Sequence, residues 1–199
     1  MEWWLMQDPM SAEHRSMALP PKGDNTDIRS RVGPTGGGVG SLSITWTLRH
    51  HGWAFVKVAD DEGETEVFAS YVTGAPEQFL CEITSLMLGK RDARVEFEGE
   101  PQVYRWFFHR DGSDVDIRLV RAKIDREPDN SGITLWSGRH TSAALGRSTV
   151  RAFDQIAHEL GEEGYESQWG RPFPRTELEA LRTAVQAHVK GSPISDTSG

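Results

Sequence analysis

The chain has 199 residues, of which 37% are hydrophobic, and a formal net charge of -8 at pH 7. This length can form one domain with a sizeable core, together with tails. The negative charge argues against a nucleic-acid-binding protein, because neutralising phosphates requires clustered Lys and Arg. The single cysteine, Cys81, excludes an internal disulfide framework and a multi-cysteine zinc site, and is typical of a reducing cytoplasm.

No run of about 18 or more apolar residues occurs, so the sequence predicts no membrane-spanning segment. The start, "MEWWLMQDPM", has neither the positive flank nor the apolar run of a signal peptide. We therefore expect a cytoplasmic protein that does not bind membranes.

Residues 1–41 are predicted to be a disordered or flexible tail, because they are rich in Pro, Gly, Asp and Ser and have no apolar period. Their glycine run lacks the lysine of a phosphate-binding loop, since Val39 stands in its place. Residues 191–199 are predicted to be a second short tail. A single domain over residues 42–190 remains.

The domain begins with three predicted strands, at residues 42–49, 53–59 and 65–72, where apolar and polar residues alternate. An acidic turn connects the last two.

Setting Val56 opposite Val67 across that turn places three aromatic residues on the opposite face: Trp53, Phe55 and Phe68. A sheet covered on one side should not expose three rings. Either the sheet is covered on both faces, which we favour, or the rings line a groove or a partner surface.

A helix is predicted after these strands, with Pro76 in its first turn and Gly89 at its end. Its apolar residues fall at helical spacing: Phe79, Leu80, Ile83, Leu86 and Met87. We expect Cys81 on or near the buried side of this helix.

Four further strands are predicted, at residues 93–99, 102–110, 114–124 and 132–138. A two-residue turn at Asp111-Gly112 sets Phe108 opposite Val115. One face is then apolar, with Tyr104, Trp106, Phe108, Val115, Ile117 and Leu119. The other face carries Arg105 opposite Arg118, Phe107 opposite Asp116, and His109 opposite Asp114.

Two amphipathic helices close the chain. Their apolar stripes are Val150, Phe153, Ile156, Ala157 and Leu160, and then, after Pro174, Leu178, Leu181, Val185 and Val189. We expect Tyr165, Trp169 and Phe173 to be buried in a connector of about 13 residues between them. The element order predicts an α+β fold. Its antiparallel or mixed, curved sheet has about six to seven strands, with one inserted helix and two C-terminal helices packed mainly on one side.

Catalytic and metal-binding motifs are incomplete. His158 and Glu159 begin a zinc-protease pattern, but residue 162 is glutamate instead of the second histidine. His109 beside Asp114 would be the beginning of a general base, although no nucleophile is identifiable near it. We expect no metal and no cofactor.

Two segments, "YRWFFHRDGSDVDIRL" and "FDQIAHELGEEGYESQWGRPFPRTELEALR", resemble small actinomycete proteins of the toxin-immunity type. The resemblance covers residues 42–190. It implies a cytoplasmic bacterial protein that blocks a toxin by occupying its surface, and it assigns no catalytic residue. The acidic charge is compatible, because an acidic inhibitor gains electrostatic steering toward a basic toxin.

The favoured hypothesis is a non-enzymatic protein-interaction module, an immunity-like inhibitor of a toxin or another partner protein. Two alternatives stay open: a small-molecule-binding protein with an aromatic-lined cavity, and a hydrolase-like enzyme using His109 and Asp114. The candidate partner-binding residues are Arg105, Phe107, His109, Asp114, Asp116 and Arg118, or Trp53, Phe55 and Phe68. The sequence does not determine the oligomeric state.

Overall fold

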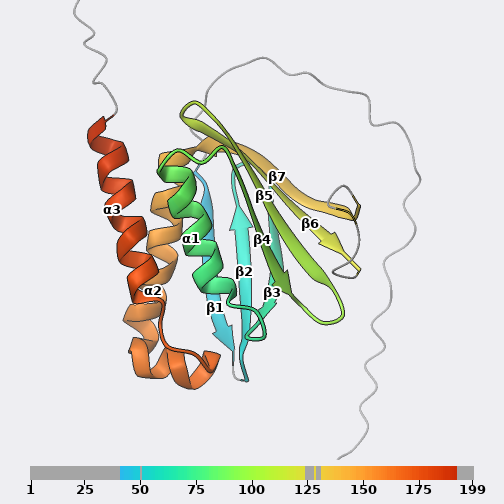
Figure 1. Ribbon diagram of the computed structural model, residues 1–199. Helices are drawn as coiled ribbons and strands as arrows, with labels where there is room; N and C mark the ends of the chain where they lie inside the picture. Colours follow the sequence, from blue (N-terminus) through green and yellow to red (C-terminus); the bar gives the residue numbers. More distant parts are fainter. Residues whose placement is uncertain (1–40, 50, 124–127, 129–130, 192–199) are drawn as a thin grey trace, which may run out of the picture. The chain divides into compact units, whose positions relative to one another are not determined.

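A computed structural model describes residues 41–49, 51–123, 128 and 131–191, without the side chains of the last three (Figure 1). The two predicted tails, 1–41 and 191–199, lie outside the described residues except at their inner ends. The elements in chain order are β1 (Ser43–Arg49), β2 (Trp53–Ala59), β3 (Glu64–Ser70), α1 (Ala75–Met87), β4 (Asp92–Glu98), β5 (Val103–Asp111), β6 (Asp114–Ala122), β7 (Ile133–Thr141), α2 (Ser142–Trp169) and α3 (Arg175–Gly191).

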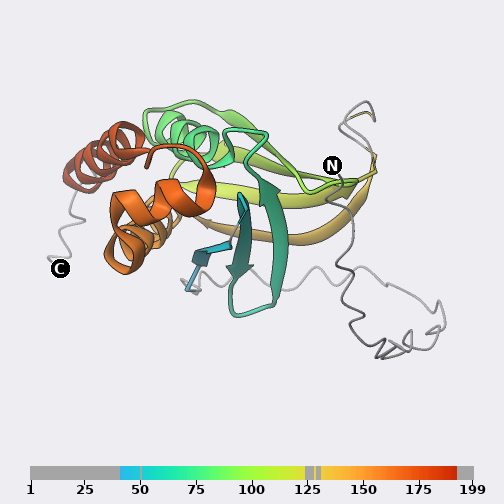
Figure 2. The same ribbon diagram turned by 90° about the horizontal axis from the view of Figure 1, so that it is seen from below.

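The α+β class and the element order are confirmed, but the single predicted sheet is wrong. The strands form two antiparallel sheets, β1-β2-β3 and β4-β5-β6-β7. The reason is the strand pairing: β3 pairs with β2 and β4 pairs with β5, and no described pairing joins β3 to β4 across the helix α1. The three helices pack against one another and lie on one side of the strands (Figure 1, Figure 2). No described helix combines the length and the apolar character needed to cross a membrane.

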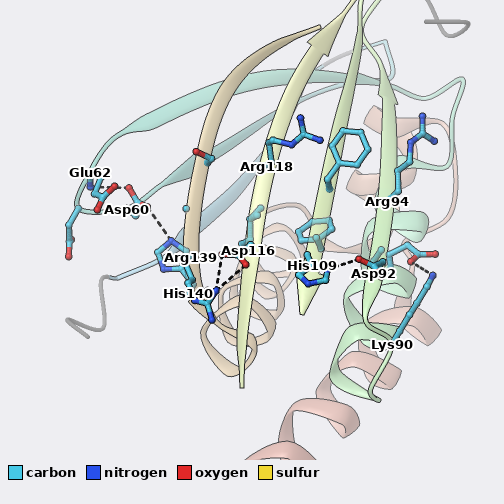
Figure 3. Close-up of a pocket in the computed structure, with 18 residues that line it drawn as sticks. Asp60, Glu62, Lys90, Asp92, Arg94, His109, Asp116, Arg118, Arg139 and His140 are labelled. Carbon is cyan, nitrogen blue, oxygen red and sulfur yellow. Dashed lines mark hydrogen bonds and ion pairs between the residues drawn. The ribbon is translucent and has the colours of Figure 1, made fainter. Parts of the chain in front are cut away.

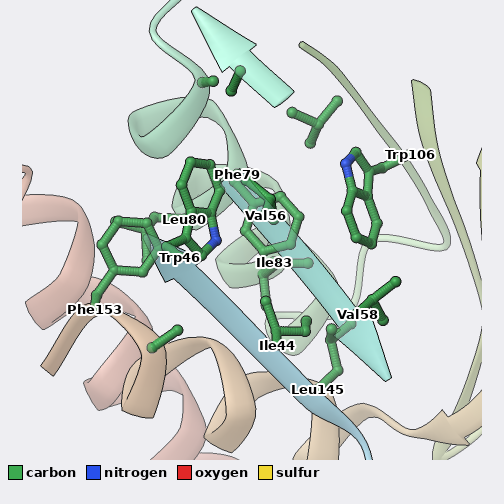
Figure 4. Close-up of a cluster of buried hydrophobic side chains, with 14 of the residues drawn as sticks. Ile44, Trp46, Val56, Val58, Phe79, Leu80, Ile83, Trp106, Leu145 and Phe153 are labelled. Atoms are coloured by element: carbon green, nitrogen blue, oxygen red, sulfur yellow. The ribbon is translucent and has the colours of Figure 1, made fainter. Parts of the chain in front are cut away.

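The hydrophobic core contains aliphatic side chains and a group of aromatic rings that lie between the two sheets (Figure 4). Phe79 of α1 is fully buried. Its ring centroid lies 5.7 Å from that of Trp46 in β1 and 5.4 Å from that of Trp106 in β5. Phe97 of β4 lies 5.4 Å from Trp46, and both contacts of Phe79 are edge-to-face. Such pairs add stability beyond the area they bury.

The predicted register of β2 and β3 is confirmed, since Val56 pairs with Val67. The aromatic rings on the outward face of this sheet are less covered than we expected. Phe55 and Phe68 contact each other edge-to-face at 4.9 Å, but Phe68 remains 37% exposed. Trp53 is half-buried. The cover that we favoured on this face is therefore only partial.

The predicted faces of β5 and β6 are confirmed, whereas the register is wrong by two residues. Asp111 pairs with Asp114, so the turn residues are Gly112 and Ser113. Gly112 has φ 62°, a left-handed conformation that glycine adopts without steric cost and that hairpin turns require. A shift of two residues preserves the face of every side chain.

The shift changes which polar residues are opposed. His109 faces Asp116 instead of Asp114. Arg105 faces Val120 instead of Arg118. The predicted Arg–Arg juxtaposition is therefore absent from this ladder.

The predicted connector before α3 is wrong, because α2 continues to Trp169. Thr141 caps the start of α2 by accepting a hydrogen bond from the backbone N–H of Ala144. Gly161, with φ 65° and ψ 175°, is not helical and divides α2 into two helical segments joined at a kink. Tyr165 and Trp169 therefore lie on a helix. Their burial, and that of Phe173, is confirmed.

Helix α1 contains Pro76 in its first turn and ends before Gly89, as predicted. The expected position of Cys81 is wrong, because its side chain is exposed. The buried stripe runs through Phe79, Leu80 and Ile83, and Cys81 lies on the opposite side of the helix.

Replacing Phe79 tests the role of the ring cluster. We expect Phe79→Ala to lower the free energy of unfolding by about 3 to 5 kcal/mol, because it leaves a cavity between the sheets. Leu88→Ala is the control, since this leucine is 72% exposed, and should change the stability by about 0.5 kcal/mol or less. Urea unfolding measures both. Equal effects of the two substitutions would contradict the assigned core.

Tyr165 predicts a pH dependence. Burial raises its pKa above the ordinary value of 10.0, Glu77 raises it further, and Arg171 lowers it. Above pH 10 the unfolded phenol ionises while the native phenol stays protonated, so stability falls as pH rises.

We expect Tyr165→Phe to remove a slope of about 1.4 kcal/mol per pH unit in urea unfolding above pH 10. The hydroxyl of Tyr165 has no hydrogen-bond partner in the described part of the chain, so the substitution should cost little stability at pH 7. Tyr71→Phe, at an exposed tyrosine, should keep the wild-type slope. A Tyr165→Phe slope equal to the wild-type one would refute the prediction.

Candidate functional site

The outer face of the four-stranded sheet carries a hollow of about 1060 Å³, which we call the sheet groove (Figure 3). Side chains from all four strands line it, and the helices lie behind the sheet in this view. Asp60, Asp61 and Glu62 of the β2–β3 turn line the groove beside β7, and Lys90 lines it next to β4.

The register aligns the outward side chains in rows across the strands. One row consists of Asp92 of β4, His109 of β5, Asp116 of β6 and Arg139 of β7. His109 Nδ1 lies 2.6 Å from Asp92 Oδ1. The predicted His109–Asp114 pair is therefore replaced by a His109–Asp92 pair.

Arg139 is surrounded by three carboxylates. Its guanidinium lies 3.3 Å from Asp111, 3.3 Å from Asp114 and 3.1 Å from Asp116. The hydrogen bond with Asp111 and the charge of Asp116 raise the pKa of Arg139 above its already high value. Asp114 therefore pairs with Arg139 and does not orient His109.

The neighbouring row consists of Arg94 of β4, Phe107 of β5, Arg118 of β6 and Ser137 of β7. The guanidinium of Arg118 lies 4.6 Å from the centroid of the Phe107 ring, in a cation–π contact. Arg94 is hydrogen-bonded to Glu96 at 2.7 Å. This row places an aromatic ring and an exposed arginine together in the groove.

Arg105 differs from the other predicted contact residues, because its side chain is fully buried. Its Nε donates a hydrogen bond to Glu96 at 2.7 Å, and its Nη1 donates one to the carbonyl of Pro128 at 3.3 Å. The structure therefore gives Arg105 a buried position, bonded to Glu96 and Pro128, and not a place on the exposed surface.

Sequence reasoning missed the pair formed by Asp60 and His140, which joins the two sheets. Asp60 Oδ2 lies 3.1 Å from His140 Nε2, and both side chains are almost completely buried. Asp60 Oδ1 accepts hydrogen bonds from the backbone N–H groups of Glu62 and Gly63. The acidic turn sequence is a local signal for these two bonds, but nothing local indicates the contact with β7.

Gly138 lies against this pair. A Cβ atom at this position would be 2.8 Å from Asp60 Oδ2 and 2.9 Å from His140 Nε2. Only glycine permits this approach without displacing the pair.

The second predicted contact set lies elsewhere. Trp53, Phe55 and Phe68 are on the outward face of the three-stranded sheet and do not line the sheet groove. The groove instead contains Phe107, His109, Asp116 and Arg118 of the first set.

The groove offers charge and ring contacts more clearly than bond-forming chemistry. His109 has an orienting carboxylate, but within the described residues no serine, threonine or cysteine is hydrogen-bonded to it. Although the Cys81 side chain is exposed, partial desolvation of the thiol, followed by the charges of Glu177 and Glu82, raises its pKa and disfavours its nucleophilic form. Among residues that the structure describes, no group of three or more His, Cys, Asp or Glu side chains could hold a metal ion.

Comparison with protein-family models, with curated proteins and with solved structures gave no match.

The Asp60–His140 pair yields a stability prediction. We expect Asp60→Ala to cost about 3 kcal/mol, because it leaves His140 buried without its partner and removes two turn hydrogen bonds. Asp61→Ala is the matched control. Asp61 is exposed, and its hydrogen bond with another described residue is the one it accepts from the hydroxyl of Ser41, at 3.5 Å, so about 0.5 kcal/mol or less is expected. Thermal and urea unfolding compare the two variants. Similar losses of stability in both would show that the Asp60–His140 pair does not stabilise the fold.

Proposed function

We propose that this protein is a non-enzymatic interaction module that binds a partner protein in the sheet groove, as an immunity-type inhibitor does. The observation that carries the proposal is the Phe107–Arg118 contact inside a hollow of about 1060 Å³ on an open sheet face. Arginine and aromatic residues are enriched at the energetic centres of protein interfaces.

The groove is built for binding without rearrangement. Most of its side chains stand on strands, and ion pairs hold several of them in place, as Asp116 holds Arg139 at 3.1 Å. A surface that is ordered before binding loses less conformational entropy when the partner docks. This supports recognition of one defined surface.

Net charge supports the class of partner. A chain with a formal charge of -8 attracts a basic protein at long range and accelerates the encounter. Toxin proteins that act on nucleic acids are often basic, so a toxin is a partner of suitable charge.

A site-specific photo-crosslink tests the proposal. Ser137 is exposed and lies in the groove next to Arg118. We expect benzoylphenylalanine at position 137 to crosslink one protein of defined mass when the full chain is expressed in its host cell and irradiated. Mass spectrometry would identify the captured protein.

Thr47 provides the matched control, because it is exposed on the outward face of the three-stranded sheet, opposite Phe55. The same photo-crosslinker at position 47 should capture no partner. Capture from position 47 alone would transfer the interface to the Trp53, Phe55 and Phe68 face. Capture from neither position would overturn the proposed function.

A further inference from the structure

The four cations that line the sheet groove differ in how their charge is compensated. Three have a carboxylate within 3.1 Å: Lys90 pairs with Glu82, Arg94 with Glu96 and Arg139 with Asp116. Arg118 is exposed, and no described carboxylate forms an ion pair with it. Within the part of the chain that the structure describes, its partner is the Phe107 ring. One cation in the groove is therefore available to an external anion.

The position of Arg118 suits such an anion. It lies on an inner strand, between Phe107 on β5 and Ser137 on β7. The carbon of the guanidinium lies 4.6 Å from the centroid of the ring, and no described carboxylate pairs with its N–H groups. A guanidinium presents these donors as a fixed fork that matches the two oxygens of a carboxylate. Ser137 adds a hydroxyl donor beside the fork.

We infer that Arg118 binds the carboxylate of an Asp or Glu side chain of the partner protein. The inference rests on the proposed function and names the chemistry of the contact in the same groove. Phe107 holds the guanidinium in place and gives the partner an apolar surface beside the ion pair. The arginine and the ring together form the centre of the interface.

The surrounding charges favour a single carboxylate over a polyanion. Asp92 and Asp116 lie in the adjacent row of the sheet, and Asp61 and Glu62 line one side of the groove. These groups repel a phosphate backbone, which places one charge after another along its length. One carboxylate on an otherwise basic partner meets Arg118 and leaves the partner's cations near the acidic side chains.

The Arg118 contact therefore fixes how the partner is oriented in the groove, while the net charge of the chain attracts the partner at long range. Long-range attraction brings a basic partner to the acidic surface without fixing its orientation. A buried arginine–carboxylate pair fixes the orientation, because a like charge placed against Arg118 is strongly unfavourable.

Binding to the captured partner is the direct test. We expect Arg118→Gln to weaken binding of the full chain at least about tenfold, as loss of a central arginine commonly does. Arg49→Gln is the control, because Arg49 also lies over a phenylalanine, Phe55, at 5.3 Å, but on the other sheet. It should change binding by less than about threefold. Charge reversal with Arg118→Glu should be rescued by a basic residue in place of the partner's contacting acid.

The outcomes separate the two proposals. If position 137 captures a partner and Arg118→Gln weakens binding no more than Arg49→Gln, the carboxylate inference fails and the proposed function stands. If no partner is captured, the proposed function fails, and a second measurement still tests the site.

That measurement is a titration of the ¹⁵N-labelled full chain with N-acetylglutamate amide, followed through the Nε–H signal of Arg118. We expect a saturable shift with this carboxylate and none with N-acetylglutamine amide, which has the same shape without the charge. No shift with either compound would overturn the inference. Unchanged backbone signals confirm that the Arg118→Gln variant is folded.

Discussion

The arrangement of this domain depends on the contact of one helix with two sheets. The ring of Phe79 reaches Trp46 on one side and Trp106 on the other. Helix α1 lies in the chain between the third and fourth strands, and the strands that follow it form a second sheet. The aromatic rings fill the space between the sheets, and their edge-to-face packing fixes how far apart the sheets lie.

This arrangement leaves the outer face of the second sheet open. The helices lie behind that sheet (Figure 3), so the outward row of Phe107, Arg118 and Ser137 meets no described helix. On the inward side of the same sheet, His140 contacts Asp60 from the first sheet. The groove therefore has a rigid wall, since the β2–β3 turn is held to β7 by a buried polar pair.

The sequence predicted those features that depend on neighbouring residues. Alternating apolar residues predicted all seven strands, and helical spacing predicted α1, because each pattern reports which side of an element is buried. Features set by distant contacts or by one backbone angle were missed. Gly112, not Asp111, adopts the left-handed turn conformation, and the segment after Gly161 is helical where a connector was expected. The contact of Asp60 with His140 spans 80 residues, and no local pattern reports it.

The alternation of the strands also bears on how the protein can evolve. Phe107 and Arg118 face outward, while their neighbours Phe108 and Ile117 face the core. A mutation at an outward position changes what the groove recognises and leaves the core packing intact. Such a mutation costs little stability, as most surface substitutions do. The groove can therefore acquire a new specificity one residue at a time. A protein that follows a changing partner benefits from such a surface, because new recognition does not require a new fold.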